Sequence, residues 1–289
     1  MEWICSSVRY ASRETLVIDE LFIASWADRV QREIPGTVAV ILKGSHARGN
    51  AGPWSDLDLD VLVFDDEIAN PYLTWIVTDG SGRLVHVSAA VERIDDWLAG
   101  FREAASWSFG FRSSEVTRLM WLGRPSLRAE LDRPSREHPG GEPELEDFIE
   151  ELGKARNARL RDDEVSLRLA VQEIAQLCPA ILVPLNEPAY PGTRPDALRA
   201  ALDLVVVPPG YRDDLLLCLG LSGQASTAGE VLAAGTRLVL GTIALLTRYA
   251  DTVCPLQAPY LGELLADGTL RRYLDQGDPD PDRDQKGSP

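Results

Sequence analysis

Basic residues and histidine are scarce in this chain of 289 residues. It has 29 Lys and Arg against 45 Asp and Glu, with 3 His, so the formal net charge is −16. Binding to a nucleic-acid backbone needs dense Lys and Arg, and the balance therefore argues against a nucleic-acid partner. An acidic cleft would instead attract a cationic small molecule, while solubility explains the charge equally well.

Cysteine is also sparse, and its spacing excludes two classes of site. The four cysteines are isolated from one another, with no Cys-x-x-Cys pair and no histidine at metal-ligand spacing: Cys5, Cys178, Cys218 and Cys254. A structural zinc site and a disulfide framework are therefore not expected. The pattern fits a protein of the reducing cytoplasm.

Long apolar runs are missing as well. The N-terminus shows no basic region followed by an apolar run, so no signal peptide is predicted. The most apolar long stretch, Val231–Thr247, contains Arg237 and is too short for a membrane span. It is interpreted as a core helix, and no membrane partner is expected.

Residues 1–130 are predicted to form an α/β (α+β) domain with a small mixed sheet. Apolar residues at helical spacing between Leu16 and Val30 predict a helix, for which Ser12 is the proposed N-cap. Three strands are predicted from apolar and β-branched runs: Thr37–Leu42, Leu57–Phe64 and Arg83–Val91. The Asp79–Gly82 turn leads into the third.

The second half of the chain is predicted to be helical. Residues 131–143 hold three prolines and two adjacent glycines among charges, which is typical of a linker. Apolar stripes at helical spacing then predict an all-helical domain over residues 144–275. Thr227 and Glu230 form a capping box, while Pro179 and Pro184 are expected to kink or end a helix. Residues 276–289 form an acidic tail predicted to be disordered.

The most informative segment is GSHARG, which follows the first strand, with SDLDLD about ten residues later. Backbone N–H groups and the Ser45 hydroxyl at the turn can hold triphosphate oxygens, and Gly44 lets phosphates approach the backbone. Arg48 can add a charge-assisted bond. Asp56 and Asp58 are two residues apart on a strand and share one face, where two carboxylates can hold Mg²⁺.

This combination resembles the signature of the DNA polymerase β-like nucleotidyltransferase superfamily. Further along, EELGKARNAR at residues 150–159 is similar to the helical motif of the kanamycin (aminoglycoside) nucleotidyltransferases. PPGYR at residues 208–212 and GLSGQ at residues 220–224 resemble a later stretch of that family. The resemblance extends from about residue 12 to about residue 250.

The resemblance implies roles for four residues of the first domain. Ser45 and Arg48, beside Gly44, would hold the triphosphate of ATP or another NTP. Asp56 and Asp58 would bind Mg²⁺ or Mn²⁺. The family also implies a homodimer with active sites at the subunit interface.

Two helical residues receive roles from the same resemblance. Glu150 would be the general base that takes the proton from the acceptor hydroxyl, and Lys154 would contact phosphates. The residues themselves show only that Glu150 and Lys154, at i and i+4, share a helix face. An ordinary surface ion pair is the alternative.

The chain departs from the superfamily pattern at the expected third acid. Val85-His86-Val87 stands there, so His86 replaces a carboxylate. His86 could be an additional metal ligand, a hydrogen-bond partner of a substrate or a packed strand histidine. Asp60 continues the carboxylate face but lies ~13 Å from Asp56 along a strand, too far to share one metal ion. Trp54 is expected to pack in the core or at its rim.

The resulting hypothesis is transfer of a nucleoside monophosphate, AMP above all, from a metal–NTP complex to a hydroxyl of a small cationic acceptor such as an aminoglycoside. Pyrophosphate would be released. One alternative is the same chemistry on another acceptor: a lincosamide-like drug, a biosynthetic sugar or a protein hydroxyl. The other is a degenerate transferase that binds nucleotide or ligand without turnover.

Overall fold

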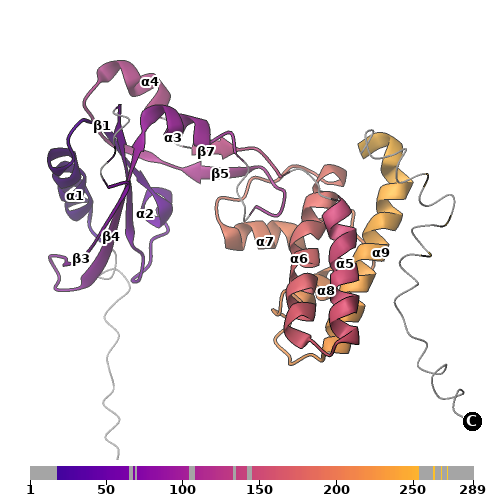
Figure 1. The fold of residues 1–289 in the computed structure, drawn as a ribbon. Helices are drawn as coiled ribbons and strands as arrows, with labels where there is room; N and C mark the ends of the chain where they lie inside the picture. The colour runs from indigo at the N-terminus through magenta and orange to yellow at the C-terminus, as the bar shows by residue number, and fades with distance from the viewer. Residues whose placement is uncertain are drawn as a thin grey trace, which may run out of the picture. The chain divides into compact units, whose positions relative to one another are not determined.

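The computed structural model describes residues 18–64, 68, 70–103, 108–132, 135–141 and 145–253, together with residues 263, 268 and 272. The chain divides into two compact units (Figure 1). The first comprises Met1–Glu103 and Ser114–His138, and the second comprises Ala104–Ser113 and Pro139–Pro289. The predicted fold class, a mixed α/β domain followed by a helical one, is confirmed.

The first unit is built on a five-stranded mixed sheet. Its strands in chain order are β1 (Thr37–Lys43), β2 (Leu57–Val63), β3 (Tyr72–Thr78), β4 (Leu84–Arg93) and β6 (Arg118–Leu122). They are arranged spatially as β3-β4-β2-β1-β6. Only β2 and β4 pair in parallel; the other neighbours are antiparallel.

Helix α1 (Glu20–Glu33) covers one face of this sheet. Trp26 and Val30 on its apolar side pack against strand residues such as Val40 and Leu59. The proposed N-cap, Ser12, lies outside the described residues, and the helix begins instead after Asp19, whose Oδ1 accepts a hydrogen bond of 2.7 Å from the Phe22 amide. Asp caps a helix as well as Ser does, and it stands directly before the apolar pattern.

A smaller core lies on the opposite face of the sheet. There Ile41 and Leu62 pack against α3 (Ile94–Gly100) and α4 (Arg128–Leu131), with a 3₁₀ turn at Pro125–Leu127 before α4. The strand residues next to this core, toward the ends of β1 and β2 where the acidic residues stand, are polar. This face therefore carries the predicted site residues of β2.

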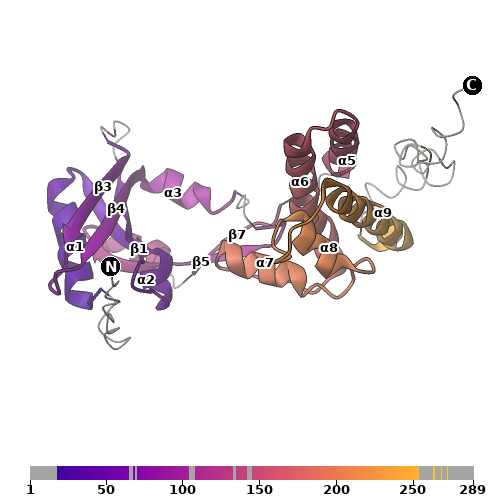
Figure 2. The same ribbon diagram turned by 90° about the horizontal axis from the view of Figure 1, so that it is seen from below.

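The three predicted strands are present, and two further strands in this sheet were not predicted. β3 is an edge strand whose side chains alternate between exposed and partly buried positions. It joins β4 through a turn in which Asp79 Oδ1 accepts hydrogen bonds from the amides of Ser81 and Arg83 at 2.9 and 3.0 Å. The serine contacts, with further help from Arg83, lower the pKa of Asp79. β3 and β4 lie side by side in Figure 2.

The segment predicted as a linker contains a strand. Ser135–His138 forms β7, which pairs with β5 (Ser113–Val116) in a separate two-stranded sheet, and Leu131 is buried at the end of α4. Four polar and charged residues carry no apolar alternation, so the strand exists only because a partner strand is available. Part of the segment 131–143 is thus structured. The acidic tail lies outside the described residues.

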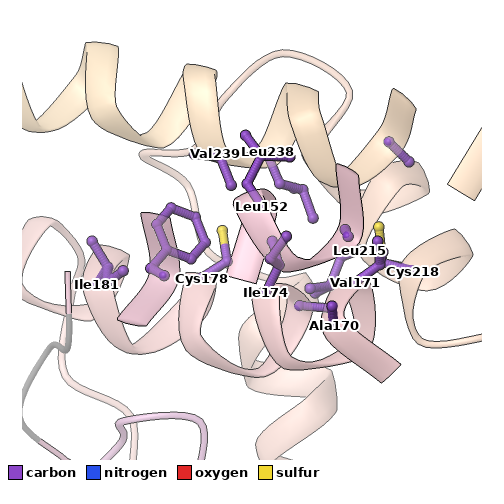
Figure 3. Packing of buried hydrophobic residues seen from close by; sticks show 14 of the residues in the cluster. Leu152, Ala170, Val171, Ile174, Cys178, Ile181, Leu215, Cys218, Leu238 and Val239 are labelled. Atoms are coloured by element: carbon purple, nitrogen blue, oxygen red, sulfur yellow. The ribbon is translucent and has the colours of Figure 1, made fainter. Parts of the chain in front are cut away.

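The second unit is a helical bundle. Its helices are α5 (Leu145–Leu160), α6 (Glu164–Leu182), α7 (Arg194–Leu202), α8 (Tyr211–Cys218) and α9 (Ala228–Val253). The apolar faces of α5, α6, α8 and α9 form one core, in which residues such as Leu152, Ile174 and Leu238 are fully buried (Figure 3). The predicted capping box is confirmed: Thr227 N donates to Glu230 Oε2 at 2.8 Å, and Glu230 N donates to Thr227 Oγ1 at 3.2 Å.

Two prolines act where the sequence predicts a helix end. Pro179 lies inside α6, which continues to Leu182, and Pro184 lies in the 3₁₀ turn Val183–Leu185 that follows. By length and composition, Glu164–Leu185 and Ala228–Tyr249 are both apolar enough to cross a membrane, and both contribute to the core of this unit. Val231–Thr247 is therefore part of a core helix.

Two of the four cysteines lie within the described residues. Cys178 and Cys218 are free thiols in the core of the helical unit. Burial raises the pKa of each to about 12, so both are inert, neutral core groups. Cys5 and Cys254 lie outside the described residues.

Candidate active site

The Gly44-Ser45 turn lies directly against a strand carboxylate. β1 ends at Lys43, and the five-residue helix α2 (Gly44–Arg48) follows at once, with Gly44 in the left-handed region at φ 69°. A Cβ atom on Gly44 would stand 2.6 Å from Asp58 Oδ2, closer than any side chain tolerates. Only glycine allows the turn and this carboxylate to be so close.

The two carboxylates of the predicted pair are held differently. Asp58 lies within β2 opposite Lys43, and its Oδ1 accepts a hydrogen bond of 2.8 Å from Ser88 Oγ. Asp56 precedes β2, and its side chain is 48% exposed. The Asp56 carboxylate is thus open to solvent, while Asp58 is anchored beside the turn.

Ser88 is a site residue that sequence reasoning missed. It is buried on β4 and pairs in register with Asp58 across the parallel β2–β4 ladder. The position level with the second strand acid is therefore Ser88, and His86 lies one pleat earlier. Counting two residues from His86 along β4 would have found it, because side chains on a strand alternate between faces.

His86 faces Asp56. Its Nδ1 lies 3.6 Å from Asp56 Oδ2, and its Nε2 lies 2.7 Å from the Thr74 hydroxyl. The side chain is 44% exposed, so His86 is not a packed core histidine. Thr74 comes from β3, the edge strand that was not predicted.

Asp60 is part of an internal ion pair. Its carboxylate is 4% exposed, lies 2.6 Å from Lys43 Nζ and accepts a hydrogen bond of 2.8 Å from Trp97 Nε1. Both oxygens are engaged within the unit. Asp60 therefore holds the end of β1, from which the Gly44-Ser45 turn begins.

Two further carboxyl groups, Glu92 and Glu115, surround this ion pair. Burial, with the nearby negative charge of Asp60, raises the pKa of each, although the ammonium group of Lys43 opposes the shift. The pKa of Lys43 is also raised. Burial lowers this pKa, but the contact with Asp60 outweighs the effect of burial. The network keeps one buried cation among several acids.

The raised pKa of Glu115 gives a pH prediction. Folded protein binds the Glu115 proton more tightly than unfolded protein, so the free energy of unfolding falls as the pH rises from about 4.5 through the folded-state pKa. Glu115→Gln removes this proton site and should make the decline shallower. Urea titrations at several pH values measure it, and an unchanged slope would contradict the assignment.

The remaining residues of the turn differ in burial. Ser45 and Arg48 are partly buried, and the Nε of Arg48 is a buried donor without a hydrogen-bond partner among the described residues. His46 is 8% exposed, and burial followed by the charge of Arg83 lowers its pKa, so it is neutral. Trp54, expected to pack, is instead 98% exposed in the loop before the acids.

Glu150 and Lys154 lie on α5 in the second unit. Lys154 Nζ is 3.5 Å from Glu150 Oε1 and 2.5 Å from Glu151 Oε1. The hydrogen bond with Glu151 is the main cause of the raised pKa of Lys154. Lys154 and Asn157 line a hollow of about 580 Å³, and Glu150 is 58% exposed beside it.

Each half of the chain matches a known protein family. Residues 23–108 match the family described as a nucleotidyltransferase domain. Residues 144–248 match the Ant-IIb family described as a nucleotidyltransferase, substrate binding domain. The chain is thus similar to a nucleotidyltransferase domain in its first half and to a nucleotidyltransferase substrate-binding domain in its second.

The two matched domains indicate a transferase enzyme. One solved structure, a nucleotidyltransferase-like protein from Exiguobacterium sibiricum 255-15, is 14% identical, with a TM-score of 0.39; the match covers 88% of this chain and 91% of that one. No curated protein sequence matches the chain.

Proposed function

We propose that this protein transfers a nucleoside monophosphate, AMP above all, from ATP or another NTP to a hydroxyl of a small cationic acceptor such as an aminoglycoside. The observation that carries the proposal is the contact between Gly44 and Asp58. This contact supports the proposal because one triphosphate could reach both the Gly44-Ser45 turn and a strand carboxylate. The substrate-binding family matched by residues 144–248 supports an acceptor site in the second half.

The donor set suits a divalent cation. Mg²⁺ prefers oxygen ligands and is commonly bound by one or two carboxylates together with substrate phosphates. Asp56 and Asp58 offer such carboxylates, with Asp58 Oδ2 facing the turn. Within the described part of the chain no three His, Cys, Asp or Glu side chains form a cation site, so phosphate oxygens would complete the ligand shell.

The residues divide the work as follows. Ser45, Arg48 and Lys154 would hold the triphosphate, and Asp56 and Asp58 would hold Mg²⁺ or Mn²⁺, which would supply charge neutralisation at the phosphates. Such positioning and neutralisation account for most catalysis in phosphoryl-type transfer.

The chemical step is an in-line displacement at the α-phosphorus. The acceptor oxygen forms a bond to this phosphorus as the bond to the bridging β-phosphate oxygen breaks, and pyrophosphate leaves. Glu150 takes the hydroxyl proton, because a sugar hydroxyl is a weak nucleophile until that proton can depart. The net charge of −16 would attract a cationic acceptor.

The proposal extends to the setting of the enzyme. By resemblance to the kanamycin nucleotidyltransferases, we infer a cytoplasmic homodimer with active sites at the subunit interface and without nucleic-acid or membrane partners. Sedimentation or light scattering of the full chain tests the dimer. A monomer at assay concentrations would remove the interface site from the proposal.

Incubation with labelled ATP, Mg²⁺ and a panel of aminoglycosides tests the reaction. The expected product is an acceptor whose mass has increased by one nucleoside monophosphate residue, with pyrophosphate formed in equal amount. Lincosamides, aminosugars and protein hydroxyls belong in the same panel, because the chemistry permits them. Pyrophosphate formation without any modified aminoglycoside would be consistent with a nucleotidyltransferase but would reject an aminoglycoside as its acceptor.

Glu150→Gln is expected to lower kcat by about 10²-fold or more, because a general base contributes that much. Glu151→Gln is the matched control: Glu151 is the adjacent residue on α5 and makes the shorter contact with Lys154. If both variants keep the wild-type kcat, Glu150 forms only a surface ion pair.

His86 favours a second candidate, a degenerate transferase that binds nucleotide without turnover. A half-exposed histidine stands on β4 where the superfamily has an acid. The absence of both product and pyrophosphate from a folded, nucleotide-binding chain, with turnover gained in His86→Asp, would favour this candidate.

A further inference from the structure

Three side chains form a line beside the strand carboxylates. The Thr74 hydroxyl lies 2.7 Å from His86 Nε2, and His86 Nδ1 lies 3.6 Å from Asp56 Oδ2. The first distance is that of a hydrogen bond, and the second is somewhat longer than one. The ring therefore has a fixed partner on one nitrogen and faces a carboxylate with the other.

The register of three strands creates this line. Val87 pairs with Leu57 across the parallel β2–β4 ladder, so His86 is level with Asp56. Ile76 opposes His86 across the antiparallel β3–β4 ladder, and Thr74 stands two residues away on the same face. The edge strand thus brings a hydroxyl to the far side of the ring.

The chemistry of the two partners determines where the ring proton sits. An ionised carboxylate only accepts hydrogen bonds, so a neutral His86 is stabilised with its N–H on Nδ1, facing Asp56. Nε2 then carries the lone pair and needs a donor. The Thr74 hydroxyl supplies it, because a hydroxyl can donate as well as accept.

We propose that Thr74 is a positioning residue that acts through His86 on Asp56. Its hydroxyl holds the neutral ring in the Nδ1–H tautomer, and the ring N–H orients the Asp56 carboxylate for a divalent cation. The effect on cation binding rests on the proposed function, whereas the tautomer of His86 is a property of the protein alone.

This role differs from that of a cation ligand. In the Nδ1–H tautomer the ring has one lone pair, on Nε2, and the Thr74 hydroxyl occupies it. His86 therefore acts on the cation through Asp56. Partners of this kind, which hold a metal ligand in place, typically change metal affinity by about 10- to 100-fold when removed.

Nuclear magnetic resonance of the full chain labelled with ¹⁵N-histidine tests the tautomer directly. The chain has 3 histidines, and the His86 signals are those lost in His86→Gln. With the ring neutral, wild-type His86 should show a protonated Nδ1 and an unprotonated Nε2. Thr74→Val should shift the ring toward the Nε2–H form, and Thr74→Ser, which keeps the hydroxyl, should restore the wild-type shifts.

Manganese affinity gives a second readout. Mn²⁺ binding in the presence of a non-hydrolysable ATP analogue, followed by electron paramagnetic resonance, should weaken about tenfold in Thr74→Val. Thr74→Ser should bind Mn²⁺ as the wild type does. Thr78→Val is the matched control, because Thr78 lies on the same face of β3 opposite Leu84, away from His86.

The outcomes separate this inference from the proposed function. A wild-type ring in the Nε2–H form, an unchanged tautomer in Thr74→Val, or equal Mn²⁺ affinity in that variant would each overturn the inference. If Thr74→Val shows both effects but the wild-type protein transfers no nucleotide to any acceptor, the inference is supported and the proposed function is rejected.

Discussion

Asp58→Asn is expected to lower kcat for nucleotidyl transfer by about 10³-fold. The substitution keeps the shape of the side chain, and an amide oxygen can still accept the hydrogen bond from Ser88. What it removes is a negative charge at the Gly44-Ser45 turn, where a divalent cation and the phosphates would meet. The fold should therefore survive, while the cation that neutralises charge in the transition state would be held less firmly.

Single-turnover measurement of acceptor modification, together with binding of a non-hydrolysable ATP analogue, separates chemistry from binding. Binding without added metal should change little, and binding with Mg²⁺ should weaken. Asp28→Asn on α1, where the carboxylate is 61% exposed in a surface ion pair, is the control and should be neutral. A kcat within tenfold of wild type in Asp58→Asn would remove Asp58 from the machinery.

Asp60→Asn is expected to destabilise the first unit by about 3 kcal/mol, because it leaves Lys43 without its buried counter-charge. The value is at the lower end for such pairs since the Lys43 side chain is 30% exposed. Glu92 and Glu115 also compensate part of the lost charge. The Trp97 hydrogen bond can persist to the amide oxygen.

Urea unfolding followed by tryptophan fluorescence measures this loss, because six of the seven tryptophans fall within the residue ranges of the first unit. Lys43→Met combined with Asp60→Asn should recover most of the stability, since removing both charges leaves none unpaired. Glu33→Gln breaks the exposed Arg29–Glu33 pair as a matched control and should cost under about 1 kcal/mol. Equal losses in Asp60→Asn and Glu33→Gln would show that the Lys43–Asp60 pair behaves as a surface pair.

Local signals in the sequence predicted the elements that carry their own pattern. Apolar spacing and a neighbouring cap identify α1, although the cap is Asp19 and not Ser12. The capping box at Thr227 was predicted because both partners lie within one helical turn. Each of these features depends on residues close together in the chain.

The strands that the sequence analysis missed depend on partners far away. β7 consists of polar and charged residues and pairs with β5, more than fifteen residues earlier. β3 is an edge strand with partly exposed faces, so burial leaves only a weak signal in its sequence. Yet this strand supplies Thr74 to the candidate site.

The sequence by itself determined the residues of the candidate site: a glycine-serine turn after one strand and two acids at the start of the next. These are local patterns, and alternation along a strand already puts Asp56 and Asp58 on one face. Only the tertiary structure decided that Ser88 anchors Asp58, that Thr74 and His86 face Asp56, and that Lys43 and Trp97 occupy Asp60. Those partners meet through the register of neighbouring strands and the packing of α3, and long-range register is not written in any local segment.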